Sequence, residues 1–206
     1  YATDASEYQE MPLAVAFPEG ESDVREIILF AGRHRVGIIP RTAGTSLAGQ
    51  VVGSGIVVDL SRHFGKILGI DKAARRVRVQ PGVVRNELNF ELAKQGLVFG
   101  PETSTANRAM IGGMVGNNSC GSNSIVYGST REHLVSVRGL FSDGSEGILH
   151  GLSPSEFEAK CRDGATMEGR IYQSIRETLG DPANRRLITE NYPRKSIPRR
   201  NTGYAL

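Results

Sequence analysis

The segment PRTAGTSLAGQ, Pro40–Gln50, follows the apolar run at residues 36–39 and decides how the first part of the chain is interpreted. It contains two glycines, Thr and Ser hydroxyls and one Arg, but no acidic residue. A glycine-rich loop directly after a strand commonly brings its backbone N–H groups close to an anion. The segment is therefore a candidate anion-binding loop.

Two common phosphate-binding motifs do not fit this loop. A P-loop requires GxxxxGK[ST], and although Gly44 and Gly49 have the right spacing, Gln50 stands where the phosphate-binding Lys belongs. The dinucleotide fingerprint GxGxxG is also absent after the first expected strand. The sequence therefore predicts neither a P-loop NTPase nor a Rossmann NAD domain.

The sequence around the loop alternates between runs typical of strands and of helices. Strands are expected at residues 13–18, 36–40, 55–60, 66–71 and 75–80, and helices from about residue 21 and from 84 to 96. Residues 133–150 contain two apolar runs around Asp143-Gly144, which is a strong hairpin signal, and His133 is expected at the start of its first strand. This pattern predicts an α+β fold.

The last quarter of the chain is expected to be helical. Ser153, Pro154 and Glu156 form a capping-box signature that begins one helix. A second helix is expected from Gly169 to Leu179, and a third from Asp181 to about Asn191. Residues 151–206 are thus interpreted as a helical insertion or linker. This region ends in a basic cluster of Arg194, Lys195, Arg199 and Arg200. The cluster is interpreted as a solvated face.

Composition excludes several classes of function. A net charge of +3, no Trp and 6% aromatic residues argue against a nucleic-acid-binding protein. No apolar run is long enough to span a membrane. Cys120 and Cys161 lack metal-ligand spacing, so no metal site is predicted, and they agree with a cytoplasmic protein. The chain reads as a piece of a longer protein.

A second glycine-rich segment, PETSTANRAMIGGMVGNNSCGSNSIVYGS, covers residues 101–129. It is too long, and too rich in small polar residues, for a routine surface turn. Its hydroxyl and amide side chains offer many neutral hydrogen-bond donors and acceptors around Gly112, Gly113 and Gly121. Such a set suits an extended cofactor with a pyrophosphate, ribityl hydroxyls and a ring that needs contacts along its edge.

Taken together and in order, the two segments resemble the vanillyl-alcohol-oxidase/PCMH superfamily of flavoproteins. Pro40–Ser46 resembles its PRGxGTS loop. Its second motif is matched by Pro101–Thr105, Ile111-Gly112-Gly113, Asn118, Gly121 and Tyr127-Gly128. Within the superfamily the sequence is most similar to D-2-hydroxy-acid dehydrogenases of the D-lactate, glycolate and D-2-hydroxyglutarate type. The GNNSCG variant and the ending IPRRNTGYAL resemble large bacterial members fused to an iron–sulfur domain.

The resemblance implies a PCMH-type FAD-binding domain over residues 1–150. It would consist of two small strand–helix subdomains that meet at about residue 62, with FAD between them. The implied cofactor-binding residues are Arg41, Thr42, Ala43, Gly44, Thr45, Ser46, Pro101, Ser104, Thr105, Gly112, Gly113, Asn118, Ser119, Gly121, Tyr127 and Gly128. Because residues 41–46 contain no His, the FAD is expected to be held non-covalently, and nearby His34 is interpreted as a surface residue.

The resemblance also implies a reaction for the complete enzyme. The α-hydrogen of a D-2-hydroxy acid would leave as hydride to the flavin while a base removes the hydroxyl proton, and an iron–sulfur domain is a candidate electron acceptor. The substrate-binding domain and the catalytic histidines are expected outside this chain, so no catalytic residue is assigned and the fragment alone is expected to be inactive. Cys120 is interpreted as a packing residue. Asp59 is interpreted as a turn or cap residue, and Glu102 as a residue that hydrogen-bonds to the backbone.

Two alternatives remain open from the sequence. One is another flavin oxidase of the superfamily, of the sugar or UDP-sugar type. The other is a non-catalytic module whose glycine loops bind a nucleotide without redox chemistry.

Overall fold

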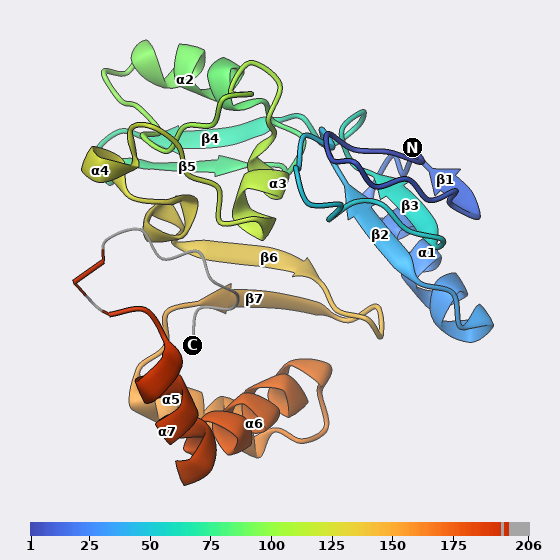
Figure 1. Ribbon diagram of the computed structural model, residues 1–206, viewed down its shortest axis with the longest axis vertical. Coiled ribbons are helices and arrows are strands. Elements are labelled where there is room, and N and C mark those ends of the chain that lie inside the picture. The colour runs from blue at the N-terminus through green and yellow to red at the C-terminus, as the bar shows by residue number, and fades with distance from the viewer. Residues whose placement is uncertain (195, 198–206) are drawn as a thin grey trace. The chain divides into compact units, whose positions relative to one another are not determined.

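The computed structural model describes residues 1–194, 196 and 197, and its chain divides into two compact units, Tyr1–Leu134 and Val135–Leu206 (Figure 1). The first unit holds both glycine-rich segments. The boundary at residue 150 that the sequence indicates remains a prediction.

A small parallel sheet with one covering helix begins the first unit. Its strands β1 (Ala14–Ala16), β2 (Ile38–Arg41) and β3 (Ile56–Asp59) lie in the order β1-β3-β2, and α1 spans Glu21–His34. Every residue of β3 is buried, because this central strand is paired on both sides and has α1 on one face. Ala31 of α1 packs against Ile56 and Val58, which forms the first hydrophobic core.

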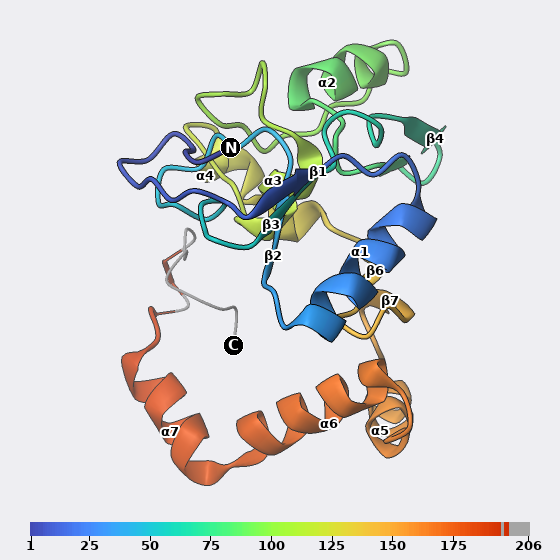
Figure 2. The ribbon, with the colours of Figure 1, turned by 90° about the vertical axis from the view of Figure 1, so that its right-hand side faces the viewer.

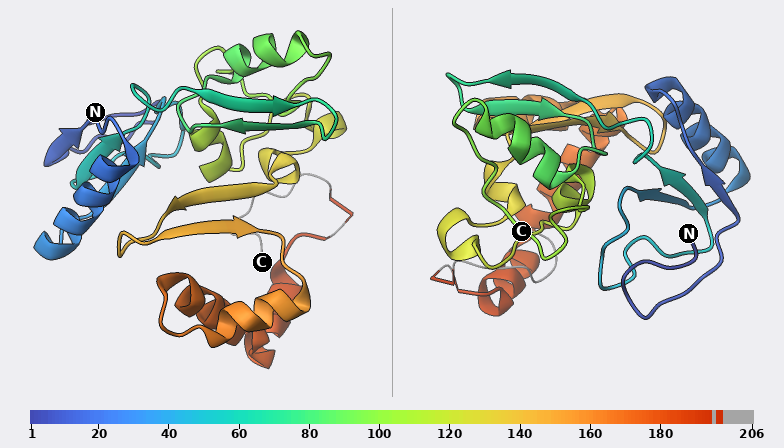
Figure 3. Two further views of the ribbon diagram at one scale, coloured as in Figure 1. Left: turned by 180° about the vertical axis from the view of Figure 1, so that it is seen from behind. Right: turned by 90° about the horizontal axis from the view of Figure 1, so that it is seen from above.

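A second, antiparallel sheet follows. It consists of β4 (Ile67–Asp71) and β5 (Arg76–Val79), and α2 (Arg85–Ala93) covers one of its faces (Figure 3). Leu88 and Leu92 of α2 are buried against a group of sheet side chains, namely Ile67, Ile70, Val77 and Val79. The interval between β3 and β4 contains residue 62, where the sequence predicts the two subdomains to meet.

Two short helices lie within the second glycine-rich segment, and a third follows it directly. They are α3 (Ile111–Gly116), α4 (Ser124–Tyr127) and the 3-10 helix η1 (Thr130–His133). Packing overrides the low helix propensity of glycine in α3. Met114 is fully buried, and the N–H of Gly112 donates to the Pro81 carbonyl at 2.8 Å. The expectation that His133 starts a strand is wrong, because η1 ends there and the hairpin begins at Ser136.

The second unit begins with the expected hairpin and continues with the expected helices. Strands β6 (Ser136–Leu140) and β7 (Glu146–His150) pair antiparallel, followed by α5 (Pro154–Arg162), α6 (Met167–Gly180) and α7 (Pro182–Asn191). The predicted cap is confirmed, since the Ser153 hydroxyl accepts the N–H of Glu156 at 3.3 Å. Of the basic cluster, Arg194 is exposed, whereas Lys195, Arg199 and Arg200 lie outside the described residues.

Candidate functional site

The first glycine loop begins where β2 ends, at Arg41. Gly44 has φ +65°, a left-handed conformation that only glycine adopts without strain. Residues 41–46 are all half-buried. Within the described part of the chain, the backbone N–H groups of residues 42–46 donate no hydrogen bond. A run of half-buried N–H groups without acceptors is a favourable environment for an anion.

The Arg41 side chain lies across this loop. Its Nη1 donates to the Thr3 carbonyl at 2.8 Å, and the guanidinium lies over the Tyr1 ring with its central carbon 5.2 Å from the ring centroid. A β-carbon at Gly44 would stand 2.3 Å from Arg41 Nη2. The backbone conformation therefore favours glycine at position 44, and a larger residue there would also have to displace the flexible Arg41 guanidinium.

Asp59 is a buried carboxylate at the end of β3, with 4% of the residue exposed. It accepts hydrogen bonds from the Tyr1 hydroxyl at 2.6 Å and from the N–H of Ser61 at 2.7 Å. Burial opposes its ionisation, but the hydrogen bonds from Ser61 and Tyr1 and the nearby Arg41 charge outweigh burial and lower its pKa. The bond to Ser61, two residues further on, is the turn contact that the sequence indicates.

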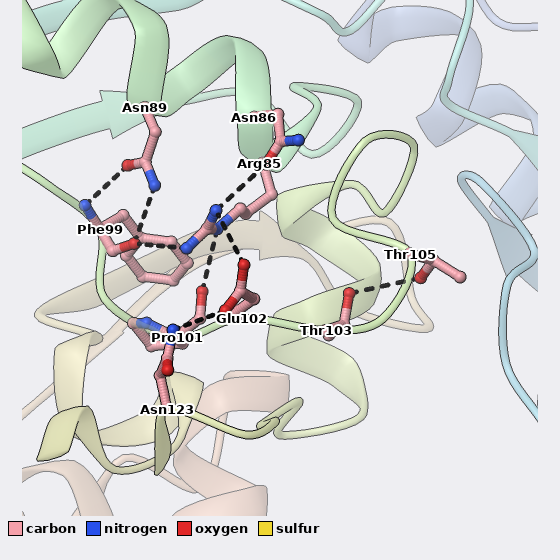
Figure 4. Close-up of polar contacts among 9 residues, drawn as sticks. All are labelled: Arg85, Asn86, Asn89, Phe99, Pro101, Glu102, Thr103, Thr105 and Asn123. Atoms are coloured by element: carbon pink, nitrogen blue, oxygen red, sulfur yellow. Dashed lines mark hydrogen bonds and ion pairs between the residues drawn. The ribbon is translucent and has the colours of Figure 1, made fainter.

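Two residues that the sequence analysis did not single out hold the start of the second motif (Figure 4). Arg85 Nε donates to the Pro101 carbonyl at 3.1 Å, and Arg85 Nη2 donates to the Phe99 carbonyl at 3.3 Å. Asn89 forms a reciprocal pair with Phe99, since its amide accepts the Phe99 N–H at 2.7 Å and donates to the Phe99 carbonyl at 3.1 Å. Arg85 and Asn89 are four apart on α2, and that spacing of polar residues beside Leu88 was the available signal.

Glu102 lies between a cation and an amide. One of its carboxylate oxygens is 3.8 Å from Arg85 Nη1, and the other accepts a hydrogen bond from Asn123 Nδ2 at 2.5 Å, as Figure 4 shows. These contacts correct the sequence interpretation, because the partners of the carboxylate are side chains and not the backbone. Glu102 thereby links α2 to the segment before α4.

Asn118 and Ser119 fix the turn that leads to η1. Asn118 has φ +47°, and its Oδ1 accepts hydrogen bonds from Ser129 Oγ at 2.8 Å and from the Arg131 N–H at 2.9 Å. The Ser119 carbonyl accepts from the Thr130 hydroxyl at 2.7 Å. Both predicted residues thus shape the protein itself in addition to any role toward a ligand.

The structure brings some of the predicted site residues together. A β-carbon at Gly113 would lie 3.0 Å from Thr42 Oγ1, so the two glycine-rich motifs meet at this point. Ser104 and Gly121 both border a polar hollow of about 660 Å³, together with Cys120 and Glu102. The residues lining this hollow do not include the first loop.

The remaining predicted residues have contacts of their own. Pro101 is fully buried, and the hydroxyls of Thr103 and Thr105 are 3.3 Å apart. The Tyr127 ring lies against Gly100, where a β-carbon would stand 2.5 Å from it. Gly128 has φ +70°, and its missing side chain leaves space for the Glu132 carboxylate. His34 is exposed at the end of α1, as expected.

Across residues 1–194, 196 and 197, no helix combines the length and apolar character needed to cross a bilayer. The same residues contain no cluster of three or more His, Cys, Asp or Glu side chains arranged to hold a metal ion.

Comparison with known proteins identifies the family to which the region around these motifs belongs. The family described as FAD binding domain matches residues 12–146. D-2-hydroxyglutarate dehydrogenase of Pantoea ananatis is 39% identical over all of this chain, which covers 20% of that protein. Glycolate oxidase subunit GlcD of Bacillus subtilis is 34% identical over 70% of this chain and 31% of that protein. The chain spans about a fifth of the length of the D-2-hydroxyglutarate dehydrogenases that it matches along its whole length.

Solved structures share the fold at lower identity. A xylooligosaccharide oxidase from Myceliophthora thermophila aligns with a TM-score of 0.65 at 21% identity, over 76% of this chain and 33% of that one. An alkyldihydroxyacetonephosphate synthase aligns with a TM-score of 0.59 at 24% identity, over 68% of this chain and 28% of that one. At these identities the likeness concerns the fold alone.

Proposed function

Because this chain belongs to the family of FAD binding domains, we propose that it is the FAD-binding part of a dehydrogenase that oxidises a D-2-hydroxy acid. The family match covers both glycine-rich motifs. The substrate class is supported by the relatives named D-2-hydroxyglutarate dehydrogenase, of which that from Escherichia coli is 38% identical over the whole chain. D-2-hydroxyglutarate is accordingly the first substrate to test.

The residues of the first loop fit a cofactor pyrophosphate. The observation that carries the proposal is the run of N–H groups at residues 42–46, which have no acceptor among the described residues and would donate to phosphate oxygens. The hydroxyls of Thr42 and Thr45 can add further donors from the same loop. Arg41 contributes positive charge nearby, although its Nη1 is bound to the Thr3 carbonyl.

The second motif would hold the remainder of the cofactor. Gly113 keeps the space beside Thr42 open, so a pyrophosphate could lie close to the backbone of both motifs. Ser104 and Gly121 offer neutral polar groups along the 660 Å³ hollow, of the kind that an isoalloxazine edge or ribityl chain requires, and Ser119 lies two residues before Gly121 in the sequence. Arg85 and Asn89 would keep this segment in place.

When bound, FAD supplies the two-electron acceptor for a hydride from the α-carbon of the acid. The residues of this chain would bind and orient the cofactor. We assign the base and the substrate-binding residues to the larger protein, since the relatives extend far beyond this chain. FAD is proposed to be non-covalent, because residues 41–46 offer no His. Electron transfer to a downstream iron–sulfur domain remains part of the proposal.

The test uses the full-length protein under anaerobic conditions. D-2-hydroxyglutarate, D-lactate, glycolate and the L enantiomers are each added, and loss of the visible flavin absorbance is followed. Bleaching by a D-2-hydroxy acid but not by its L enantiomer is expected. Bleaching by sugars alone would contradict the substrate class, and a nucleotide bound without any flavin would contradict the redox function.

A further inference from the structure

The residues before β1 fold back on themselves and run beside the first glycine loop (Figure 2). Thr3 and Gln9 form an antiparallel bridge, and the N–H of Glu10 donates to the Ala2 carbonyl at 2.9 Å. The N–H of Ser6 donates to Asp4 Oδ1 at 2.8 Å, which closes a tight local turn. We call this folded segment, Tyr1–Glu10, the strap.

The strap is fastened to the first loop at several points. Ser46 Oγ donates to Asp4 Oδ2 at 2.5 Å, and the N–H of Ala5 donates to the Ser46 carbonyl at 3.1 Å. Arg41 Nη1 donates to the Thr3 carbonyl at 2.8 Å. These contacts join residues far apart in the sequence and bind both ends of the segment Arg41–Ser46.

The first loop depends on such outside contacts for its shape. Within the described chain, the N–H groups of residues 42–46 form no internal hydrogen bonds that could hold the loop. The Ser46 hydroxyl proton is directed to Asp4 and is therefore not available to a phosphate oxygen. The Ser46 side chain thus acts toward the strap, and the role of Ser46 as a cofactor-binding residue remains a prediction.

We propose that the strap positions the loop for FAD, with the Asp4–Ser46 pair as its clasp. This inference rests on the proposed function, since the bound group is the pyrophosphate of the cofactor. By holding Ser46 on one side and Arg41 on the other, the strap keeps the N–H groups of residues 42–46 free to face the anion. Opening the clasp lets the loop relax and speeds FAD release.

Because Asp4 is charged, its effect through charge and its role as a hydrogen-bond acceptor predict opposite changes in the rate of FAD release. A carboxylate beside a pyrophosphate site repels the bound anion, so by charge alone its removal would slow FAD release. As the acceptor in the clasp, its removal would speed FAD release. Asp4→Ala removes both the charge and the acceptor, whereas Asp4→Asn removes the charge and keeps an acceptor for Ser46.

The experiment measures the rate of FAD release from the full-length holoprotein after dilution, by the recovery of flavin fluorescence. Asp4→Ala is expected to release FAD roughly tenfold faster, because a hydrogen bond to a charged group is worth about one decade. Asp4→Asn is expected to release FAD at about the wild-type rate or more slowly. Glu7→Ala is the matched control, since Glu7 lies on the strap but has no hydrogen bond or ion pair within the described residues.

A second measurement tests the effect of the Asp4–Ser46 hydrogen bond in the protein without FAD. Hydrogen exchange of the Ala5 amide, which is bonded to the Ser46 carbonyl, is expected to accelerate in the Asp4→Ala apoprotein. Unchanged Ala5 exchange, or FAD release in Asp4→Ala that is no faster than wild type, would overturn the positioning role. A wild-type protein that binds no FAD would overturn the proposed function as well, and is recognised separately by its lack of flavin absorbance.

Discussion

The hydroxyl of Thr42 lies 3.0 Å from the point that a β-carbon would occupy at Gly113. Thr42 belongs to the loop after β2, and Gly113 belongs to α3 in the second glycine-rich segment. The two motifs therefore approach each other with only the missing side chain of a glycine between them. We propose that the cofactor pyrophosphate lies near this contact.

Gly113→Val should weaken FAD binding, because the added side chain pushes against Thr42. Gly116→Val is a matched control in the same helix, where a β-carbon meets nothing within 4 Å. Both variants carry the same β-branched side chain, so their difference isolates the Thr42 contact. We expect FAD affinity to fall roughly tenfold more for Gly113→Val, which corresponds to about 1.4 kcal/mol. Equal affinities in a titration would refute the contact.

Gly44→Ala should strongly reduce FAD retention. Alanine at φ +65° is strained by about 1–2 kcal/mol, and its β-carbon would also displace the Arg41 guanidinium. Gly96→Ala is the control, since Gly96 has φ +70° but open space around it. That control should lower the free energy of unfolding while leaving FAD content unchanged, as measured by absorbance after purification. Loss of FAD in both variants would point to general destabilisation.

Gly44→Asp should be more severe than Gly44→Ala. It crowds the Arg41 guanidinium in the same way and adds a carboxylate to the loop that we propose to bind the pyrophosphate. Retention of FAD by Gly44→Asp would be incompatible with an anion site at this loop.

Arg85→Ala should destabilise the first unit. The Arg85 side chain is 11% exposed, and its removal leaves the Pro101 carbonyl without this donor. We expect the free energy of unfolding to fall by about 2–3 kcal/mol in urea titrations. Arg85→Lys should recover little, because an ammonium group cannot reproduce the guanidinium geometry. Arg108→Ala, at an exposed position, should change stability by less than about 0.5 kcal/mol.

The Asp59 carboxylate should make the free energy of unfolding depend on pH in the acid range. Its folded-state pKa is lowered, because hydrogen bonds from Ser61 and Tyr1 and the Arg41 charge outweigh the opposing effect of burial. The resulting stabilisation is present above the unfolded pKa of about 3.9 and is lost as pH falls through the folded value. Asp59→Asn should therefore have a lower free energy of unfolding than the wild type mainly above that pH range. Its free energy of unfolding should also vary less than that of the wild type across acid pH. An unchanged acid slope would show that Asp59 is not responsible.

Much of the fold follows from local patterns. The apolar runs of β2 and β3 and the cap at Ser153 are local signals, and their elements lie where the sequence predicts them. Helix α3 could not be predicted in this way, since its glycines disfavour a helix on their own. Its formation depends on contacts with Pro81 and on the burial of Met114, which are tertiary effects.

The candidate site, like the fold, can be predicted only in part from the sequence. The motifs identify the segments, but they do not reveal which groups inside them are already bound by the protein. Ser46 is among the cofactor-binding residues that the resemblance implies, and its hydroxyl is bonded to Asp4. The spacing of Arg85 and Asn89 on α2 marks them as neighbours, but their partners are backbone groups of Phe99 and Pro101, which the sequence does not identify.

The most direct measurement is the flavin content of the purified full-length protein before and after acid precipitation. We predict a protein with visible flavin absorbance, FAD in equimolar amount, and all of that flavin in the supernatant once the protein is precipitated. A colourless protein that stays colourless after addition of FAD would contradict the account.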